Sequence, residues 1–364
     1  MEETIYRQGS FESFYDTPLE INWLLTNMCN YRCSYCFGQE AINADKFSDL
    51  NQIKNAVANI EKMNRSSIMI TLSGGEPTTH PHLLDCLNLL KEKLNTRLKG
   101  ILIISNGSAK SEVYEKIASF GNELNIKIEI SIHTEFVKVD HIVELIKKIS
   151  GKVDLEFPLM FNPEKKDLVY DIYNKFVELR ADYPFHVIVQ TLRQPPLFDE
   201  LDYRYTEEDY LWQRNAQKCF DDVASQGIDN ICRHRWESAF PKTFFWDVYD
   251  KNGNRKIVTE LDRNEAFQRG LLEFENMYCI QGSSVLCIGV NGACKKTNCS
   301  ASSEEFNIFE EVNPDELNKA SIIKCPYKNC GCGTNHPIPK FKDREEADAF
   351  VNIHLNNDLL NFSK

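Results

Sequence analysis

Between residues 20 and 192, short apolar runs alternate with segments whose apolar residues repeat at helical spacing. The strand-like runs lie at residues 20–26, 67–73, 100–105, 127–133, 153–161 and 185–192. Helical spacing is clear between several of them, for example at Leu50, Ile53, Val57 and Ile60. Parallel strands need a crossover connection, and strands that are buried on both faces are continuous apolar runs. The alternation therefore predicts an α/β fold built on a parallel sheet.

The alternation ends after residue 192. Residues 195–215 are acidic and aromatic and predict a connecting region with a short helix or two. Residues 257–299 contain short β-like pieces, and Asn291-Gly292 predicts the turn of a β-hairpin. We expect an N-terminal segment, an α/β core, a connecting region, a small cysteine-rich domain and a C-terminal helix or tail, at residues 1–19, 20–195, 196–256, 257–340 and 341–364.

The 13 cysteines are the second informative feature of the chain. The N-terminus has no hydrophobic signal region, so we expect a cytoplasmic protein with reduced thiols, in which close spacing favours metal binding over disulfides. Three cysteines lie within residues 29–36, seven lie within 279–332, and the others are Cys86, Cys219 and Cys232. These last three are most simply small buried hydrophobic side chains.

Charge and hydropathy argue against two classes of partner. The formal net charge of −12 disfavours non-specific binding to nucleic acid or anionic membranes, because both depend on clustered Lys and Arg. The longest apolar stretches are too short to span a bilayer. We therefore expect no nucleic-acid partner and no membrane association.

Two motifs follow the first two predicted strands. CNYRCSYC, residues 29–36, has three thiols, one fewer than the usual four of a zinc or iron–sulfur site. Such a loop can hold three irons of a cubane cluster and leave one iron open to another ligand, although a zinc knuckle or structural cysteines remain alternatives. In GGEP, residues 74–77, two glycines leave a backbone edge that a ligand can approach closely.

The order CNYRCSYC, strand, SGGEP in an alternating β/α chain resembles the radical S-adenosylmethionine (AdoMet) superfamily, over residues 20 to about 192. The resemblance implies a partial (βα)6 barrel in which Cys29, Cys33 and Cys36 bind a [4Fe-4S] cluster. AdoMet would chelate the fourth iron. The AdoMet-binding residues that it implies are Tyr35 near the adenine, Gly74, Gly75, Glu76 and Pro77 near the methionine ammonium, and Asn106 and Ser131 near the ribose or carboxylate. Asn106 could instead be a turn residue, and Ser131 a buried strand hydroxyl.

The same resemblance implies a chemistry. An electron donor such as flavodoxin or ferredoxin would reduce the cluster, AdoMet would be cleaved to a 5′-deoxyadenosyl radical, and the radical would take hydrogen from a substrate C–H bond. The chain would then be a radical SAM oxidoreductase.

The downstream cysteines resemble the auxiliary-cluster extension called SPASM, or its shorter twitch form. CIQGSSVLCIGVNGACKKTNC is followed by a compact terminal group of only three cysteines, which departs from the full SPASM pattern. The resemblance implies at least one auxiliary [4Fe-4S] cluster, bound by Cys279, Cys299 and two or more of Cys325, Cys330 and Cys332. Cys287 and Cys294 look like packing residues of a hairpin, and a structural zinc site is the alternative.

The substrate is less constrained. Only 28 residues precede Cys29, which leaves no room for a folded peptide-leader domain and favours a small molecule such as a sugar or nucleotide sugar. Modification of a peptide or protein side chain is the alternative, and a non-catalytic iron–sulfur scaffold is an alternative of another class. Catalytic candidates are His133 as a proton carrier, and Cys219 or Cys232 as the hydrogen donor of an epimerase. Arginines in RHRW, residues 233–236, could clamp an anion, although a solvated surface is the simpler expectation.

Overall fold

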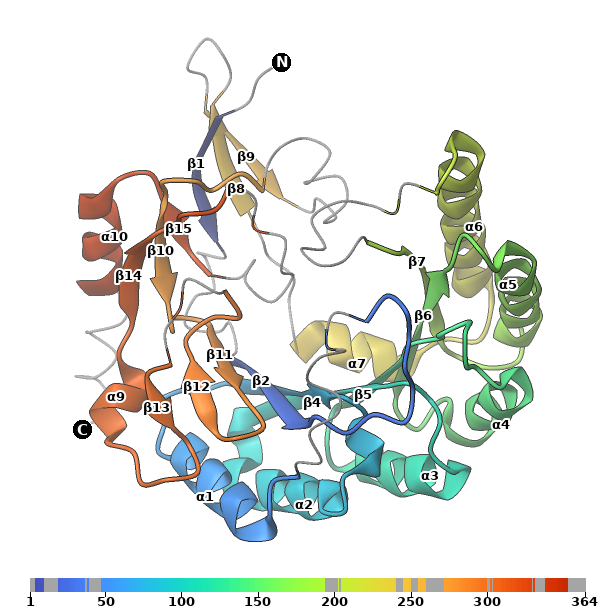
Figure 1. Cartoon of the computed structure of the whole chain (residues 1–364), viewed down its shortest axis with the longest axis horizontal. Coiled ribbons are helices and arrows are strands. Elements are labelled where there is room, and N and C mark those ends of the chain that lie inside the picture. The colour runs from blue at the N-terminus through green and yellow to red at the C-terminus, as the bar shows by residue number, and fades with distance from the viewer. Residues whose placement is uncertain are drawn as a thin grey trace.

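Two β-sheets organise the chain in the computed structural model (Figure 1). The structure describes residues 4–9, 19–36, 38, 47–193, 202, 204–239, 245–249, 255–259, 272–299, 302, 304–328, 330 and 338–352. Within these residues, the nine-stranded sheet has the order β13-β12-β11-β2-β3-β4-β5-β6-β7, and the six-stranded sheet the order β14-β10-β15-β1-β8-β9. Cys332 and most of residues 194–203 lie outside the described residues.

Six neighbouring parallel strands form the core of the larger sheet and confirm the predicted α/β fold. They are β2 (Leu19–Thr26), β3 (Ile68–Gly74), β4 (Leu98–Ser105), β5 (Ile126–Ile130), β6 (Asp154–Phe161) and β7 (His186–Thr191). The crossover helices pack on the outside of this curved sheet (Figure 1) and are α1 (Leu50–Glu61), α2 (Leu83–Leu94), α3 (Ser111–Ser119), α4 (Val139–Ile149) and α5 (Lys166–Arg180). The arrangement is the partial barrel that the alternation and the family resemblance implied.

Strand β5 has one apolar and one polar face. In β5, Ile126, Ile128 and Ile130 are fully buried in the core beneath the helices. Because successive side chains point to opposite faces, Lys127 and Glu129 face the barrel interior. Polar side chains can therefore line the interior while the helices cover a continuous hydrophobic layer.

The C-terminal extension is joined to the barrel through the sheet itself. Strand β11 (Val285–Ile288) pairs in parallel with β2, and β12 (Ala293–Lys295) and β13 (Phe306–Asn307) continue the sheet. The predicted hairpin at Asn291-Gly292 is confirmed, and Gly292 has a φ of +82° that favours glycine. Asn59 of α1 fixes this extension, because its buried amide donates to the carbonyls of Ile308 at 2.9 Å and Glu310 at 2.7 Å.

The six-stranded sheet combines strands from both ends of the chain. It contains β1 (Thr4–Gly9), β8 (Phe245–Tyr249), β9 (Arg255–Thr259), β10 (Tyr278–Gln281), β14 (Ser321–Lys324) and β15 (Lys340–Phe341). Helix α10 (Arg344–Val351) packs on one face of it through a small hydrophobic cluster that includes Ile280, Phe341 and Phe350. The short helix α9 (Pro314–Asn318) precedes β14.

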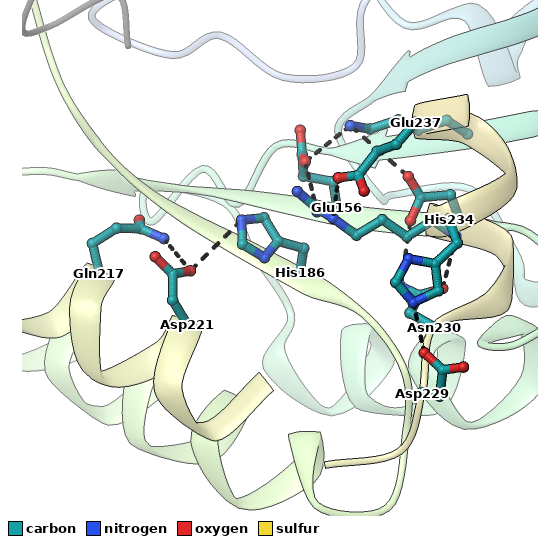
Figure 2. Close-up of polar contacts among 11 residues, drawn as sticks. Glu156, His186, Gln217, Asp221, Asp229, Asn230, His234 and Glu237 are labelled. Atoms are coloured by element: carbon teal, nitrogen blue, oxygen red, sulfur yellow. Dashed lines mark hydrogen bonds and ion pairs between the residues drawn. The ribbon is translucent and has the colours of Figure 1, made fainter. Parts of the chain in front are cut away.

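The connecting region contains helices α6 (Glu207–Gln226) and α7 (Ile231–Ala239) in addition to strand β8, and α6 is longer than the short helix that we expected. Helix α7 lies at the amino-terminal ends of the barrel strands, because the backbone carbonyl of Arg235 accepts a hydrogen bond from the side-chain amide of Asn125, the residue just before β5. In Figure 2, Glu156 lies in a network of charged side chains that joins β6 to α7. Lys127 Nζ lies 2.9 Å from Glu156 Oε2, and Arg233 NH1 lies 3.5 Å from it.

This network corrects one expectation about RHRW. His234 and Arg235 are exposed, but Arg233 is partly buried in the ion pair with Glu156, and Trp236 is buried. The segment therefore closes the amino-terminal end of the barrel and is not a solvated surface throughout. No helix in the described ranges is long and apolar enough to cross a membrane.

Candidate functional site

The cysteine loop after β2 and the GGEP loop after β3 are bound to each other through their backbones. Gly75 N–H donates to Thr26 O at 2.7 Å, and Glu76 N–H donates to Met28 O at 2.6 Å. A Cβ atom on Gly74 would lie 2.1 Å from Thr26 O, and one on Gly75 would lie 2.1 Å from Met28 O. The sequence predicted that these glycines admit a ligand. The structure shows that they first admit the cysteine loop itself.

Glu76 joins the end of β3 to the end of β4. Its side chain is fully buried and accepts hydrogen bonds from Asn106 N–H at 2.6 Å, Ser105 Oγ at 2.8 Å and Thr78 N–H at 3.0 Å. Burial raises the pKa of this carboxyl, and the hydrogen bonds oppose that rise. The Glu76 side chain thus positions the loops at the mouth of the barrel, and its carboxylate oxygens already accept hydrogen bonds from protein groups.

The three cysteines of the loop have the surroundings that an iron–sulfur cluster needs. Cys29 Sγ accepts from Tyr31 N–H at 3.4 Å and from Asn106 Nδ2 at 3.7 Å, and Cys36 Sγ accepts from Gly38 N–H at 3.4 Å. Hydrogen bonds to sulfur and burial are the means by which proteins tune such clusters. Burial raises the pKa of Cys29, and it raises the pKa of Cys33 to about 12. Cationic iron would therefore have to stabilise these thiolates.

The donor set fits a cluster better than a single zinc ion. Among the residues that the structure describes, no three His, Cys, Asp or Glu side chains converge closely enough to hold one metal ion. Thiolates that bind separate irons of a cubane lie farther apart than the ligands of one tetrahedral zinc. The three thiols are nevertheless close, because Cys36 raises the pKa of Cys29, and Cys29 and Cys36 both raise the pKa of Cys33. Three thiolates on one loop suit three irons of a cubane, whose fourth iron takes another ligand.

An aromatic cluster lies against the cysteine loop. Tyr35 OH and His133 Nδ1 are 3.0 Å apart, and the two rings stack with centroids at 5.8 Å. Tyr31 stacks on Phe136 with centroids at 5.0 Å. Burial lowers the pKa of His133 to about 4, so its imidazole is neutral at pH 7. The structure thus brings His133 to the mouth of the barrel, beside the loop that carries the cysteines.

The segment after β5 also holds the cysteine loop in place. Glu135 accepts from Ser34 N–H at 2.9 Å and from the Ser34 hydroxyl. Ser131, which is buried, donates its N–H to Ser105 O at 2.8 Å. Tyr35, Asn106, Ser131 and the GGEP loop therefore all lie at the carboxyl ends of neighbouring strands, where ligand sites gather in α/β folds.

Two of the catalytic candidates lie elsewhere. Cys219 is exposed on α6, and Cys232 is buried on α7 with its thiol 3.3 Å from Gly151 O, at the amino-terminal side of β6. The cysteine loop is at the opposite ends of the strands. The structure does not bring Cys219 or Cys232 to the mouth, where a hydrogen donor to substrate would be needed.

Four described cysteines of the extension lie near one another. Burial raises the pKa of Cys279 to about 12, the positive charge of Lys340 opposes the rise, and Cys330, Cys325 and Cys299 add to it. Cys325 N–H donates to Met277 O at 2.8 Å, and Cys330 N–H donates to Leu272 O at 2.9 Å, which fixes both beside the start of β10. In the adjoining hairpin, Cys294 is buried in the main core and Cys287 packs against the cluster of Cys279, Val285 and Ile338. Both therefore have packing roles.

Two half-buried acids inside the barrel were missed by sequence reasoning. Burial raises the pKa of Glu20 on β2 and of Glu129 on β5 to about 7 each. Glu129 lies level with Glu156 of the neighbouring strand, whose negative charge adds to the shift. The available signal was the alternation in KIEISIH, residues 127–133, which places Lys127, Glu129, Ser131 and His133 on one strand face.

Glu129→Gln should stabilise the fold at alkaline pH. The folded-state pKa of about 7 lies above the unfolded value of 4.5, so wild-type stability is lost as the pH rises from 4.5 through 7. The variant has no such loss, and its advantage in free energy of unfolding should grow by roughly 3 kcal/mol between pH 5 and pH 8. Urea denaturation of both proteins at several pH values measures this, with the exposed Glu92→Gln as control. An advantage that does not change with pH would contradict the assignment.

Comparison with known proteins agrees with this site. Residues 23–155 match the family model of the radical SAM superfamily. The nucleotide dehydratase RSAD2 of Oncorhynchus mykiss, described as S-adenosylmethionine-dependent, is 32% identical over 113 residues, which cover 30% of this chain and 30% of that protein. The mitochondrial GTP 3′,8-cyclase of Arabidopsis thaliana is 27% identical over 178 residues, which cover 45% and 43%. This chain therefore spans less than half the length of both curated relatives.

A solved structure shows the same fold over more of the chain. SuiB of Streptococcus suis, bound to S-adenosylmethionine, has a TM-score of 0.50 at 14% identity, covering 82% of this chain and 65% of that one. A partial parallel barrel with a three-cysteine loop at the carboxyl end of its first strand defines a radical SAM protein. The chain contains a radical SAM domain, matched over residues 23–155, and carries a C-terminal cysteine-rich extension. Members of this superfamily use a [4Fe-4S] cluster together with AdoMet.

Proposed function

We propose that the chain is a radical SAM enzyme in which Cys29, Cys33 and Cys36 hold the cluster that cleaves AdoMet. The observation that supports this most is the backbone pairing of the cysteine loop with the GGEP loop, through Thr26 and Met28. When bound, the cluster and AdoMet supply a low-potential electron and a 5′-deoxyadenosyl radical that takes hydrogen from a substrate C–H bond. The protein supplies the orientation of both groups and a site that excludes water.

The mouth of the barrel offers distinct groups to AdoMet. The carbonyl of Glu76 already accepts from Thr79 N–H at 3.1 Å, and that of Pro77 accepts from His80 N–H at 3.0 Å. We propose that backbone carbonyls of the GGEP loop, residues 74–77, receive the methionine ammonium, because a carbonyl oxygen that accepts one N–H can accept a second donor. Tyr35 would contact the adenine, and Asn106 and Ser131 the ribose or carboxylate. The hydrogen bond between Tyr35 and His133 would hold the tyrosine ring in place.

The extension would hold at least one auxiliary [4Fe-4S] cluster. The grouping of Cys279, Cys299, Cys325 and Cys330 supports this part of the proposal, because the other three lie close enough to raise the pKa of buried Cys279. The extension shares the barrel sheet through β11 and is fixed to α1 through Asn59. The auxiliary cluster would therefore keep a constant position relative to the barrel. Electron transfer between the site in the barrel and this cluster requires such a constant position.

The substrate that we propose is a nucleotide or nucleotide sugar, or a related small molecule. Both curated relatives act on nucleotides according to their descriptions, and this chain is similar to them over part of its length. The proposed reaction is an oxidation in which the auxiliary cluster accepts the electron of the substrate radical. Neutral His133 at the mouth and Glu129 farther inside are the proposed acceptors of the proton that leaves.

Anaerobic reconstitution with iron and sulfide, followed by dithionite and AdoMet, tests the enzyme. Formation of 5′-deoxyadenosine is expected, and a complete lack of it would favour a non-catalytic iron–sulfur scaffold. Panels of nucleoside triphosphates, nucleotide sugars and peptides then test the substrate class. Nucleotides are expected to accelerate 5′-deoxyadenosine formation and to be consumed with it. Acceleration by peptides alone would move the assignment to peptide or protein modification.

A further inference from the structure

A buried lysine lies directly opposite one of the proposed auxiliary cysteines. Strand β15 pairs antiparallel with β10, and the register places Lys340 across from Cys279. Directly opposed residues of an antiparallel pair project from the same face of the sheet, with their Cβ atoms about 5 Å apart. The other face of this sheet packs against α10 through Ile280 and Phe341. Lys340 therefore projects toward the side on which the cysteines gather.

The contacts of the Lys340 side chain are of the kind that a cation makes. The side chain is 2% exposed, and its Nζ donates to Ile338 O at 2.9 Å. The same atom lies over the ring of Phe274, 4.8 Å from its centroid, and Phe274 is itself fully buried. A carbonyl dipole and an aromatic face both stabilise a cation, and neither cancels its charge.

We propose that Lys340 is a charge-tuning residue that raises the reduction potential of the auxiliary cluster. The inference rests on the proposed function in one respect, the assignment of Cys279 as a cluster ligand. A [4Fe-4S] cluster with four thiolates is anionic, and reduction adds one further negative charge. A fixed cation beside a ligand stabilises the reduced form more than the oxidised form, and the effect is strong where water is excluded. The auxiliary cluster would then be biased to accept an electron from a substrate radical, as an oxidation needs.

Redox titration of the isolated auxiliary cluster tests this inference. The full chain with Cys29, Cys33 and Cys36 changed to alanine leaves only that cluster, and its reduced signal can be followed by electron paramagnetic resonance as the potential is lowered. In this background, Lys340→Met and Lys340→Gln are expected to lower the equilibrium constant for reduction by about tenfold or more. For a one-electron couple, tenfold corresponds to about 59 mV.

Two further variants separate charge from packing. Lys340→Arg keeps the charge and should stay closer to the unsubstituted background than either neutral variant. Lys324→Met is the matched control, because Lys324 is an exposed lysine of the same sheet that lies opposite Tyr278, on the other face from Cys279. It should leave the potential unchanged. Iron and sulfide are counted for every variant before titration.

Three outcomes would overturn the inference. The potential could be unchanged in both neutral variants, or shifted as far in the arginine variant as in the neutral ones. Loss of the cluster from both neutral variants would assign Lys340 to holding the cluster instead of tuning it. If the triple-alanine background contains no iron at all, the assignment of an auxiliary cluster is wrong. Formation of 5′-deoxyadenosine by the wild type would still support the proposed radical SAM enzyme. If the Lys340 variants shift the potential but the wild type forms no 5′-deoxyadenosine, the inference about Lys340 stands and the proposed enzyme activity fails.

Discussion

Gly75→Ala is expected to abolish 5′-deoxyadenosine formation and to remove about four irons from the reconstituted chain, the content of one cubane. The new Cβ atom would lie 2.1 Å from the backbone oxygen of Met28, which no side-chain rotation can relieve. Either the GGEP loop or the cysteine loop must move, and the hydrogen bond from Glu76 N–H to Met28 O would be lost with it. Because Cys29 follows Met28 directly, the first proposed ligand would be displaced.

The matched control for this change is Gly38→Ala, in the cysteine loop. A Cβ there would lie 3.7 Å from Cys36 Sγ, an ordinary contact, so the cluster and the activity should be retained. Iron and sulfide analysis and 5′-deoxyadenosine formation are measured for both variants. A Gly75→Ala protein that keeps its full iron content and activity would show that the contact between the two loops does not position the cluster.

Changing Cys29, Cys33 and Cys36 together to alanine should eliminate 5′-deoxyadenosine formation and leave the extension's iron in place. The reason is the separation of the two groups of cysteines, one on the loop after β2 and the other around β10. We expect about four irons to remain per chain if the extension binds one cubane, and about eight if it binds two. The exposed Cys219→Ala on α6 is the control and should keep both the activity and the full iron content.

The triple variant distinguishes the possible assignments directly. Complete loss of iron would remove the auxiliary cluster from the proposal. An iron content equal to that of the wild type would show that the loop after β2 does not bind the cluster. Absorption and electron paramagnetic resonance spectra identify the cluster type that remains.

Much of the barrel was readable from the sequence because its signals are local. All six parallel strands occur at the predicted positions, within a few residues, since buried strands are continuous apolar runs. The hairpin at Asn291-Gly292 was predictable because a tight turn with positive φ favours glycine. The sequence also indicated which loops meet, because parallel strands place their carboxyl ends at one edge.

Other features were not readable because they depend on contacts between distant segments. Nothing local indicates that β11 adds to the edge of β2 in parallel, or that β1 pairs with β15 and β8 in a second sheet. The same holds for α7, whose Arg233 closes the amino-terminal end of the barrel through Glu156 (Figure 2). As a result, RHRW was interpreted as surface, and Cys232 was considered as a hydrogen donor although it lies at the far end of the strands.

The sequence by itself determined the superfamily and the donor set, because three cysteines, two glycines and their order after two strands are properties of the chain. Tertiary structure alone decided what those residues contact. In the fold, the two glycines allow two backbones to approach closely. The Glu76 side chain accepts hydrogen bonds from Asn106, Ser105 and Thr78. The strand register places Lys340 opposite Cys279. The physical reason is that register and burial arise only when strands far apart in the chain pair. A charge has its effect only through the neighbours that such pairing provides.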